Sequence, residues 1–171
     1  MSNTYYRQLN INSKITANIK KKIEESSEDQ WGTTLEQNLL LLTIDDFELD
    51  NEIVQLITDI GDTNRLAVYR FFGEECYNWH VDMIRPTALN MLIAGFDSMC
   101  IFGVPAVNRR FTHVSRLQHE PNQYYLMDVK QMHTVYNFSN ETRYILSLGL
   151  PNIKYKDACI YLQEHNLLLH K

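Results

Sequence analysis

Eight short runs rich in branched and aromatic residues follow one another between residues 65 and 150, and no helical pattern separates them. Turn-forming residues mark the breaks, among them Gly73, Pro86, Gly95, Pro105 and Pro121. Short consecutive strands joined by turns pair into antiparallel sheets, which close as a sandwich or a barrel. The runs cover residues 65–72, 78–82, 88–95, 99–104, 110–117, 124–129, 133–138 and 143–150. Eight is the strand number of a jelly roll, so the sequence predicts a mainly β, cupin-like jelly roll.

The rest of the chain is expected to flank this core within a single domain, since 171 residues are enough for one hydrophobic core. Residues 1–64 are predicted to form a helical support region, because isoleucines recur at helical spacing over 11–23 and 53–60. The apolar run at 38–44 is compatible with a buried strand or with a piece of helix. Residues 151–171 are predicted to contain a C-terminal helix that packs on the sheet.

Composition limits the partners and the compartment. The net charge of -5 gives no electrostatic reason to expect nucleic acid as the main partner. The longest apolar run is too short to span a membrane, and no signal peptide is visible at the N-terminus. The three cysteines, Cys76, Cys100 and Cys159, form no CxxC motif, which argues against a disulfide framework and a cysteine zinc site. A cytoplasmic protein without a membrane partner is the prediction.

The second run contains a histidine and an aspartate two residues apart, in the tripeptide His80-Val81-Asp82. In a strand, alternate side chains share a face, so His80 and Asp82 should point to one side and Trp79 and Val81 to the other. An imidazole and a carboxylate on one face can bind a common metal ion, or they can form an ordinary surface ion pair.

Two residues further along the chain favour the metal. His133 opens the seventh run, and Arg143 opens the eighth, ten residues later. Two imidazoles and a carboxylate on one side of a ferrous ion form a facial triad, which leaves positions for a bidentate ligand and dioxygen. A buried arginine near such a site needs an anionic partner, and a dicarboxylate that chelates the metal with its other end would supply one.

This pattern resembles the iron(II)- and 2-oxoglutarate-dependent dioxygenases, in particular their prolyl and aspartyl/asparaginyl hydroxylase branches. The resemblance implies a double-stranded β-helix over residues 65–150, with Fe(II) bound by His80, Asp82 and His133. It also implies that Arg143 holds the far carboxylate of 2-oxoglutarate. The implied reaction hydroxylates an aliphatic carbon of a protein side chain, an amino acid or another small molecule, and yields succinate and CO2.

Secondary candidates lie near these residues in the chain. The resemblance suggests that Tyr69, in the first core strand, contacts 2-oxoglutarate, and Asn90, which interrupts an apolar run, is expected to bind the cosubstrate or a neighbouring strand. Arg85, in the turn after Asp82, is a candidate for binding substrate. His113 and His119 are expected at the surface or the rim of the fold.

Two other functions stay open from the sequence. A cupin-like metalloprotein that does not use 2-oxoglutarate would use Arg143 for another anion. A jelly-roll binding module would retain the same residues without catalysis. The metal content of the purified protein separates the binding module from both metal-dependent functions.

Overall fold

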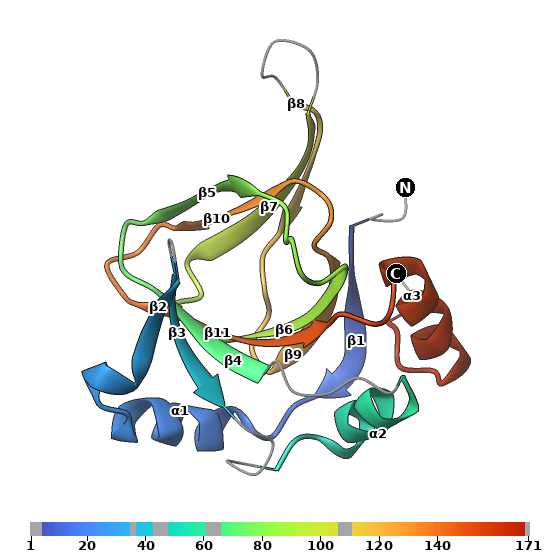
Figure 1. Cartoon of the computed structure of the whole chain (residues 1–171), viewed down its shortest axis with the longest axis horizontal. Helices are drawn as coiled ribbons and strands as arrows, with labels where there is room; N and C mark the ends of the chain where they lie inside the picture. The colour runs from blue at the N-terminus through green and yellow to red at the C-terminus, as the bar shows by residue number, and fades with distance from the viewer. Residues whose placement is uncertain (1–4, 35–36, 43–47, 61–65, 106–110, 170–171) are drawn as a thin grey trace.

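The computed structural model describes residues 5–34, 37–42, 48–60, 66–105 and 111–169, which form two antiparallel sheets stacked face to face (Figure 1). The strands of the larger sheet, in spatial order, are β1 (Tyr6–Asn12), β9 (Gln123–Asp128), β6 (Thr87–Ala94), β11 (Arg143–Leu150), β4 (Leu66–Phe71), β3 (Gln37–Leu42) and β2 (Trp31–Thr34). The smaller sheet contains β5 (Cys76–His80), β10 (His133–Asn137), β7 (Ser98–Pro105) and β8 (Phe111–Leu117).

The eight strands expected from the sequence are β4 to β11, and the predicted cupin-like jelly roll is confirmed. Strands β4, β6, β9 and β11 lie in the larger sheet, and strands β5, β7, β8 and β10 lie in the smaller one. The chain therefore crosses repeatedly from one sheet to the other, which is the winding of a double-stranded β-helix.

The N-terminal region contains the expected helices, α1 (Thr16–Glu25) and α2 (Asn51–Asp59), and a 3-10 turn, η1 (Glu28–Gln30). It also supplies three strands, of which β1 and β2 were not predicted and β3 covers the run that was compatible with a strand or a helix. Strand β1 pairs with β9, and β2 and β3 extend the larger sheet beyond β4. The apolar run that was left open is a strand as far as Leu42, and its last two residues lie outside the described part of the chain.

One buried arginine connects this N-terminal extension to the core. The guanidinium of Arg70, on β4, donates to both carboxylate oxygens of Glu28 at 2.8 and 2.6 Å. It also lies 4.3 Å from the centroid of the Trp31 ring. A two-pronged ion pair combined with a cation–π contact fixes the orientation of β2 relative to β4.

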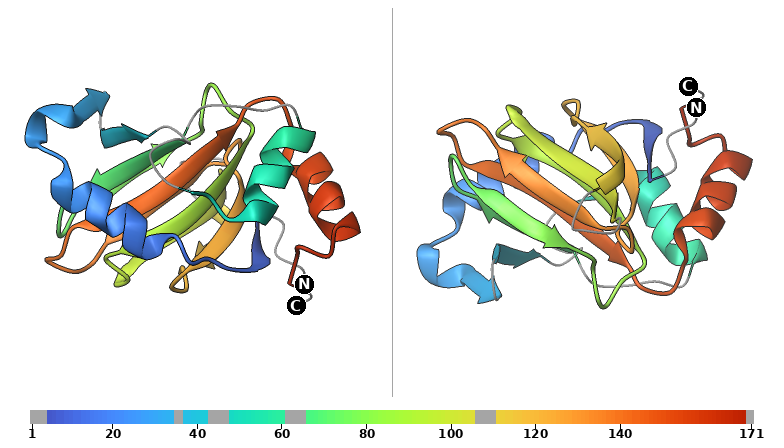
Figure 2. Two further views of the ribbon diagram at one scale, coloured as in Figure 1. Left: turned by 90° about the horizontal axis from the view of Figure 1, so that it is seen from below. Right: turned by 90° about the horizontal axis from the view of Figure 1, so that it is seen from above.

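Side-chain alternation gives the larger sheet two different faces. On β11, Tyr144, Leu146 and Leu148 belong to the main hydrophobic cluster or pack against it. Helices α1 and α2 contribute Ile19, Ile53 and other residues to the same cluster, and α1 crosses the outer face of this sheet (Figure 2). The other face of the larger sheet points toward the smaller sheet, and side chains of both sheets line a cavity between them.

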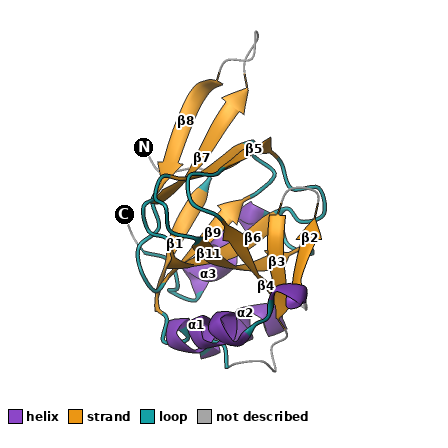
Figure 3. Cartoon of the chain, turned by 90° about the vertical axis from the view of Figure 1, so that its left-hand side faces the viewer, coloured by secondary structure: helices purple, strands orange, loops and turns teal. Residues whose placement is uncertain are grey.

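The predicted C-terminal helix is α3 (Tyr155–Glu164), which follows β11 directly and buries Ala158 and Leu162 in the main cluster. The hydroxyl of Tyr161 donates to Asp59 at the end of α2. Figure 3 shows α1 and α2 on the side of the larger sheet that is away from β5, β7 and β8. The helices α1 and α2 thus pack against the face of the larger sheet that points away from the smaller sheet.

Two observations bear on the expectations from composition. The three cysteines are unpaired, with Cys100 buried, Cys159 partly buried and Cys76 exposed. Among the described residues, no helix combines the length and the apolar character that a membrane crossing requires.

Candidate metal centre

The two histidines of the predicted triad are neighbours across a pair of strands. His80 ends β5, and His133 begins β10 directly opposite it in the antiparallel ladder. The register shifts between His133 and Val135, because β5 carries an extra residue at this point. Such a bulge redirects side chains, and here both Tyr77 and His80 line the cavity although they are not an even number of residues apart.

Asp82 lies beyond the end of β5, so the prediction that it belongs to the strand is wrong in this detail. Its backbone N–H donates to the carbonyl of Val129 at 2.9 Å. The ammonium of Lys130 donates to the carbonyls of Asp82 and Met83 at 2.8 and 2.9 Å. The position of Asp82 is therefore set by the segment between β9 and β10, which also leads to His133.

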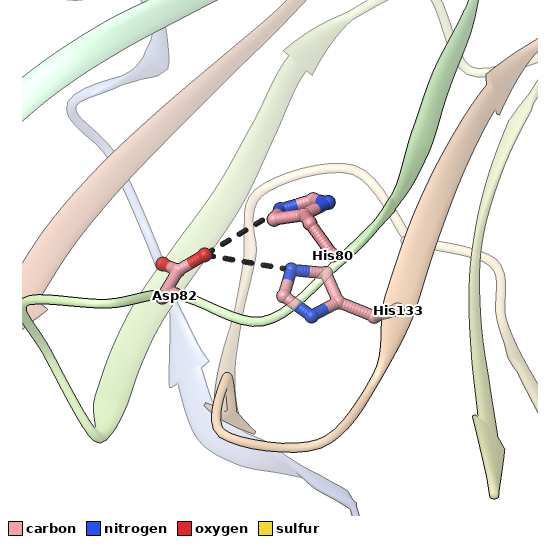
Figure 4. Close-up of side chains that lie close together, drawn as sticks. All are labelled: His80, Asp82 and His133. Carbon is pink, nitrogen blue, oxygen red and sulfur yellow. Dashed lines mark ion pairs between the residues drawn. The ribbon is translucent and has the colours of Figure 1, made fainter. Parts of the chain in front are cut away.

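The three side chains converge on one point (Figure 4). Their potential ligand atoms all lie within 4.8 Å of one another. The Asp82 Oδ1 atom is 3.4 Å from His80 Nε2 and 3.8 Å from His133 Nε2. The Nδ1 atoms point away, to the carbonyls of Asn78 and Gln131 at 2.8 and 2.9 Å. Because Nδ1 donates to a carbonyl, each Nε2 is left as an electron-pair donor for a metal ion.

The protonation states of the cluster suit a cation. Burial raises the pKa of Asp82, but the neighbouring His80 and the charge of Arg85 outweigh that effect and bring it to about 2. Burial and the neighbouring His80 lower the pKa of His133 to about 4, against the effect of its bond to the Gln131 carbonyl. At neutral pH the site thus offers a carboxylate and an uncharged His133 imidazole.

The donor set fits a divalent first-row metal that is bound on one side only. Two imidazole nitrogens and one carboxylate oxygen are the ligands of an open ferrous site. Cys100 lines the same cavity without joining the cluster, and burial raises the pKa of its thiol to about 12. The three ligands face a cavity of about 480 Å³ between the two sheets, which has room for a small organic molecule.

Arg143, the first residue of β11, lines the same cavity and is only 1% exposed. Its Nε donates to Ser98 Oγ at 3.0 Å, and its guanidinium carbon lies 5.2 Å from the centroid of the Phe71 ring. Its Nη1 has no hydrogen-bond partner, and within the described residues no carboxylate pairs with it. Burial without an acidic partner lowers the pKa of Arg143 to about 10.

Arg85 lines the cavity on the side of the metal ligands. Its Nε donates to Asp82 Oδ2 at 2.6 Å, and its Nη1 donates to Ser147 Oγ at 2.8 Å. Its guanidinium carbon is 6.0 Å from the centroid of the Tyr69 ring. The arginine that the sequence suggested for substrate binding therefore holds the second oxygen of the Asp82 carboxylate in this structure.

Tyr69 and Asn90 both line the cavity, as their candidate roles require. Tyr69 lies on β4, two residues before Phe71. Asn90 is buried on β6, and its Nδ2 donates to the Met127 sulfur at 3.0 Å, while its Oδ1 has no partner among the described residues. Both residues thus lie at the cavity, while their contacts to a ligand stay predictions.

His119 is the residue that the sequence misplaced. It was expected at the surface or rim, but it is 3% exposed and lines the cavity. Neither ring nitrogen has a hydrogen-bond partner in the described part of the chain. Its ring lies edge-on to Tyr125, with 5.0 Å between the centroids. A histidine shortly before a proline carries no local pattern that distinguishes a buried residue from an exposed one.

The fold and the converging side chains define a double-stranded β-helix protein with a candidate site for one metal ion. No family model matches the sequence, and no curated protein matches it. Solved structures do resemble it. One is a Pseudomonas putida prolyl-4-hydroxylase, which is 9% identical with a TM-score of 0.55 over 84% of this chain and 91% of that one.

Two further structures share the fold. AviO1 from Streptomyces viridochromogenes Tue57 is 10% identical with a TM-score of 0.55, over 86% of this chain and 90% of its own. An oxidoreductase of the 2OG-Fe(II) oxygenase family from Burkholderia pseudomallei is 11% identical with a TM-score of 0.51, over 81% of each chain. At these identities the likeness establishes the fold, and the chemistry must be argued from the residues of the site.

Proposed function

We propose that the protein is an Fe(II)- and 2-oxoglutarate-dependent dioxygenase that hydroxylates an aliphatic carbon. The observation that carries this proposal is the buried guanidinium of Arg143, which has no acidic partner among the described residues and lines the same cavity as an open cluster of three metal ligands. A buried cation without a counter-ion is costly unless a ligand supplies the negative charge. A dicarboxylate can chelate the metal with one end and neutralise the Arg143 guanidinium with the other.

Each residue of the site has a defined task under this proposal. His80, Asp82 and His133 hold the metal, and the Nδ1 bonds to Asn78 and Gln131 fix the two rings. Arg143 binds the far carboxylate with its free Nη1. Iron bound here would supply the coupled oxidation in which 2-oxoglutarate, dioxygen and a C–H bond give succinate, CO2 and an alcohol.

The remaining residues orient these groups and exclude water. Arg85 keeps one oxygen of Asp82 engaged, so that the other oxygen faces the metal position. Phe71, Val135 and Ile145 give the cavity apolar walls, which limit the access of water to the reacting centre. A protein side chain, an amino acid or another small molecule is the proposed substrate, with dioxygen as the co-reactant. Similar folds in a prolyl-4-hydroxylase and a 2OG-Fe(II) oxygenase support this choice of chemistry.

The direct test is the formation of succinate. The purified chain is incubated in air with Fe(II) and 2-oxoglutarate, alone and with panels of peptides and amino acids, and succinate is measured by mass spectrometry. We expect Fe(II)-dependent succinate that rises with one substrate class, and none from His133→Ala or in the absence of dioxygen.

Binding separates this function from its rivals. Arg143→Ala should weaken 2-oxoglutarate binding to the Mn(II)-loaded protein by about 2–4 kcal/mol, because a charge-assisted contact is lost in a dry site. The variant should bind Mn(II) as the wild type does. Metal binding with no difference in 2-oxoglutarate affinity would favour a cupin-like metalloprotein that uses another anion. The absence of metal binding would favour a binding module.

A further inference from the structure

The cavity contains a second buried polar side chain that the triad and Arg143 do not account for. His119 follows the end of β8, where Leu117 is the register partner of Cys100 on β7. Arg143 is bonded to Ser98, two residues before Cys100 on the same strand. Residue 119 lies two positions beyond Leu117, and Ser98 lies two positions before Cys100, so His119 and Ser98 are level with each other along β7. Arg143 and His119 therefore both reach the cavity beside this end of β7.

His119 is held in place without using either ring nitrogen. Its ring packs against Tyr125, whose hydroxyl accepts from the backbone N–H of Glu120 at 3.2 Å. Tyr125 is in turn the register partner of Asn90, whose Oδ1 is also without a partner among the described residues. Three side chains that line one cavity thus carry polar atoms without a partner in the described part of the chain: Arg143 Nη1, Asn90 Oδ1 and both ring nitrogens of His119. A buried group of this kind in a native protein needs a ligand or a water molecule to satisfy it.

We propose that His119 is a binding residue for the far carboxylate of the cosubstrate, to which it donates a second hydrogen bond beside the one from Arg143. The inference rests on the proposed function for the identity of the cosubstrate, and it extends the carboxylate site to a residue of this chain. Burial and the charge of Arg143 lower the pKa of His119 well below its ordinary value, so the imidazole is uncharged at neutral pH. An uncharged imidazole still donates one N–H, and the guanidinium supplies the positive charge.

The test compares two acids that chelate a metal identically. 2-Oxoglutarate carries the far carboxylate, and 2-oxopentanoate lacks it. Both acids are titrated by calorimetry into Mn(II)-loaded wild type, His119→Phe and His119→Gln. The phenylalanine keeps the ring contact with Tyr125 and removes both nitrogens, while the glutamine restores an N–H donor. His113→Phe is the matched control, because His113 is an exposed histidine on β8 that does not line the cavity.

We expect His119→Phe to bind 2-oxoglutarate about 10- to 100-fold more weakly than the wild type. Its affinity for 2-oxopentanoate should stay within about twofold of the wild type. His119→Gln should recover part of the loss, and His113→Phe should match the wild type with both acids. An equal loss for the two acids, or no loss for either, would overturn the assignment, since His119 would then act only through packing.

The titrations also distinguish a wrong assignment of His119 from a wrong proposed function. If Arg143→Ala abolishes the preference for 2-oxoglutarate while His119→Phe retains it, the proposed function stands and the role of His119 is wrong. Glutarate, which cannot chelate through a keto group, is also titrated into the metal-free protein. If the metal-loaded wild type binds neither oxo acid but the metal-free protein binds glutarate through His119, the carboxylate site stands and the oxygenase function is wrong. Binding of none of the three acids overturns both.

Discussion

Asp82 and Arg143 are charged residues of one cavity, and their surroundings are opposite. The Asp82 carboxylate is contacted by Arg85 and lies within 4 Å of two imidazoles, so its negative charge is stabilised in the absence of a metal. Arg143 has a hydroxyl and an aromatic ring as its neighbours and no carboxylate among the described residues. The protein therefore stabilises the charged form of Asp82 before a metal binds. The charge of Arg143, in contrast, is neutralised only when an anionic ligand binds.

This difference predicts that Asp82→Asn loses metal binding and keeps the fold. The amide oxygen can still accept from Arg85 Nε, whereas truncation to alanine would remove that acceptor. A neutral amide is a much weaker ligand than a carboxylate for a divalent cation. Titration with Mn(II) should show an affinity at least about 100-fold below that of the wild type, with the metal-free melting temperatures within a few degrees. Equal Mn(II) affinities would make Asp82 a partner of Arg85 only.

For Arg143, we expect a substitution that removes the charge to preserve or increase stability while it abolishes ligand binding. Arg143→Met removes a buried charge that has no counter-ion among the described residues and fills nearly the same volume, at the expense of the bond to Ser98. We expect the free energy of unfolding of the metal-free protein to be unchanged or to rise by about 1–3 kcal/mol, while 2-oxoglutarate binding is lost. Urea unfolding of both proteins measures the difference. A marked loss of stability would show that an acidic group already compensates the guanidinium.

At the level of elements, the turn between β6 and β7 determines where β11 begins. Gly95 has a φ of +76°, a conformation that L side chains rarely adopt. A Cβ atom added at Gly95 would lie 2.6 Å from the Cα of Arg143. The β6–β11 register also shifts between Tyr144 and Ile145, close to this contact. The backbone of Arg143 thus approaches the turn closely because residue 95 has no side chain.

Gly95→Ala should therefore destabilise the protein by about 2–4 kcal/mol, since backbone strain and a steric clash combine. The shift of β11 should also weaken 2-oxoglutarate binding by the protein that remains folded. Gly95→Asn is the informative comparison, because asparagine tolerates a positive φ better than alanine does. If close approach is the dominant cause, both variants lose similar stability in urea unfolding. If Gly95→Asn has nearly the stability of the wild type, the positive φ alone requires the glycine.

On the scale of the whole molecule, the proposed ligands connect the two sheets. His80 and His133 belong to the smaller sheet, and Arg143 belongs to the larger sheet, which the helices support. A metal ion joins β5, β10 and the turn at Asp82, and a dicarboxylate would extend that link to β11. Ligand binding should consequently stabilise the protein in two steps.

We expect Mn(II) at about 100 times its Kd to add about 2.7 kcal/mol of stability, which corresponds to a rise of about 5–10 °C in Tm for a chain of this size. Saturating 2-oxoglutarate should raise Tm further in the metal-loaded wild type, and it should not do so in Arg143→Met. Thermal melts with each ligand alone and with both test the two steps. A full 2-oxoglutarate shift in Arg143→Met would place the carboxylate elsewhere.

The sequence alone determined the eight core strands and the residues that form the candidate metal cluster. Strand periodicity is a local property, and it located the strands. The alternation predicted over residues 79–82 is wrong, because β5 ends at His80 and Val81 lines the same cavity as His80 and Asp82.

Periodicity placed His133 and Arg143 at the starts of their strands. Tyr69 was suggested by the family resemblance and Asn90 by its interruption of an apolar run, and both line the cavity. The partners of these residues were not predictable, because a pattern along one strand says nothing of its neighbour.

Tertiary structure decided the features that depend on what packs over a segment. Strands β1, β2 and β3 form because the edges of the larger sheet offer unpaired backbone groups. The bulge in β5 places Tyr77 and His80 on one face, which strict alternation does not allow. His119 is buried because, beyond the end of β8, its ring packs against Tyr125 and lines the cavity. Burial of a residue outside a strand depends on contacts with distant parts of the chain, and the local sequence does not contain them.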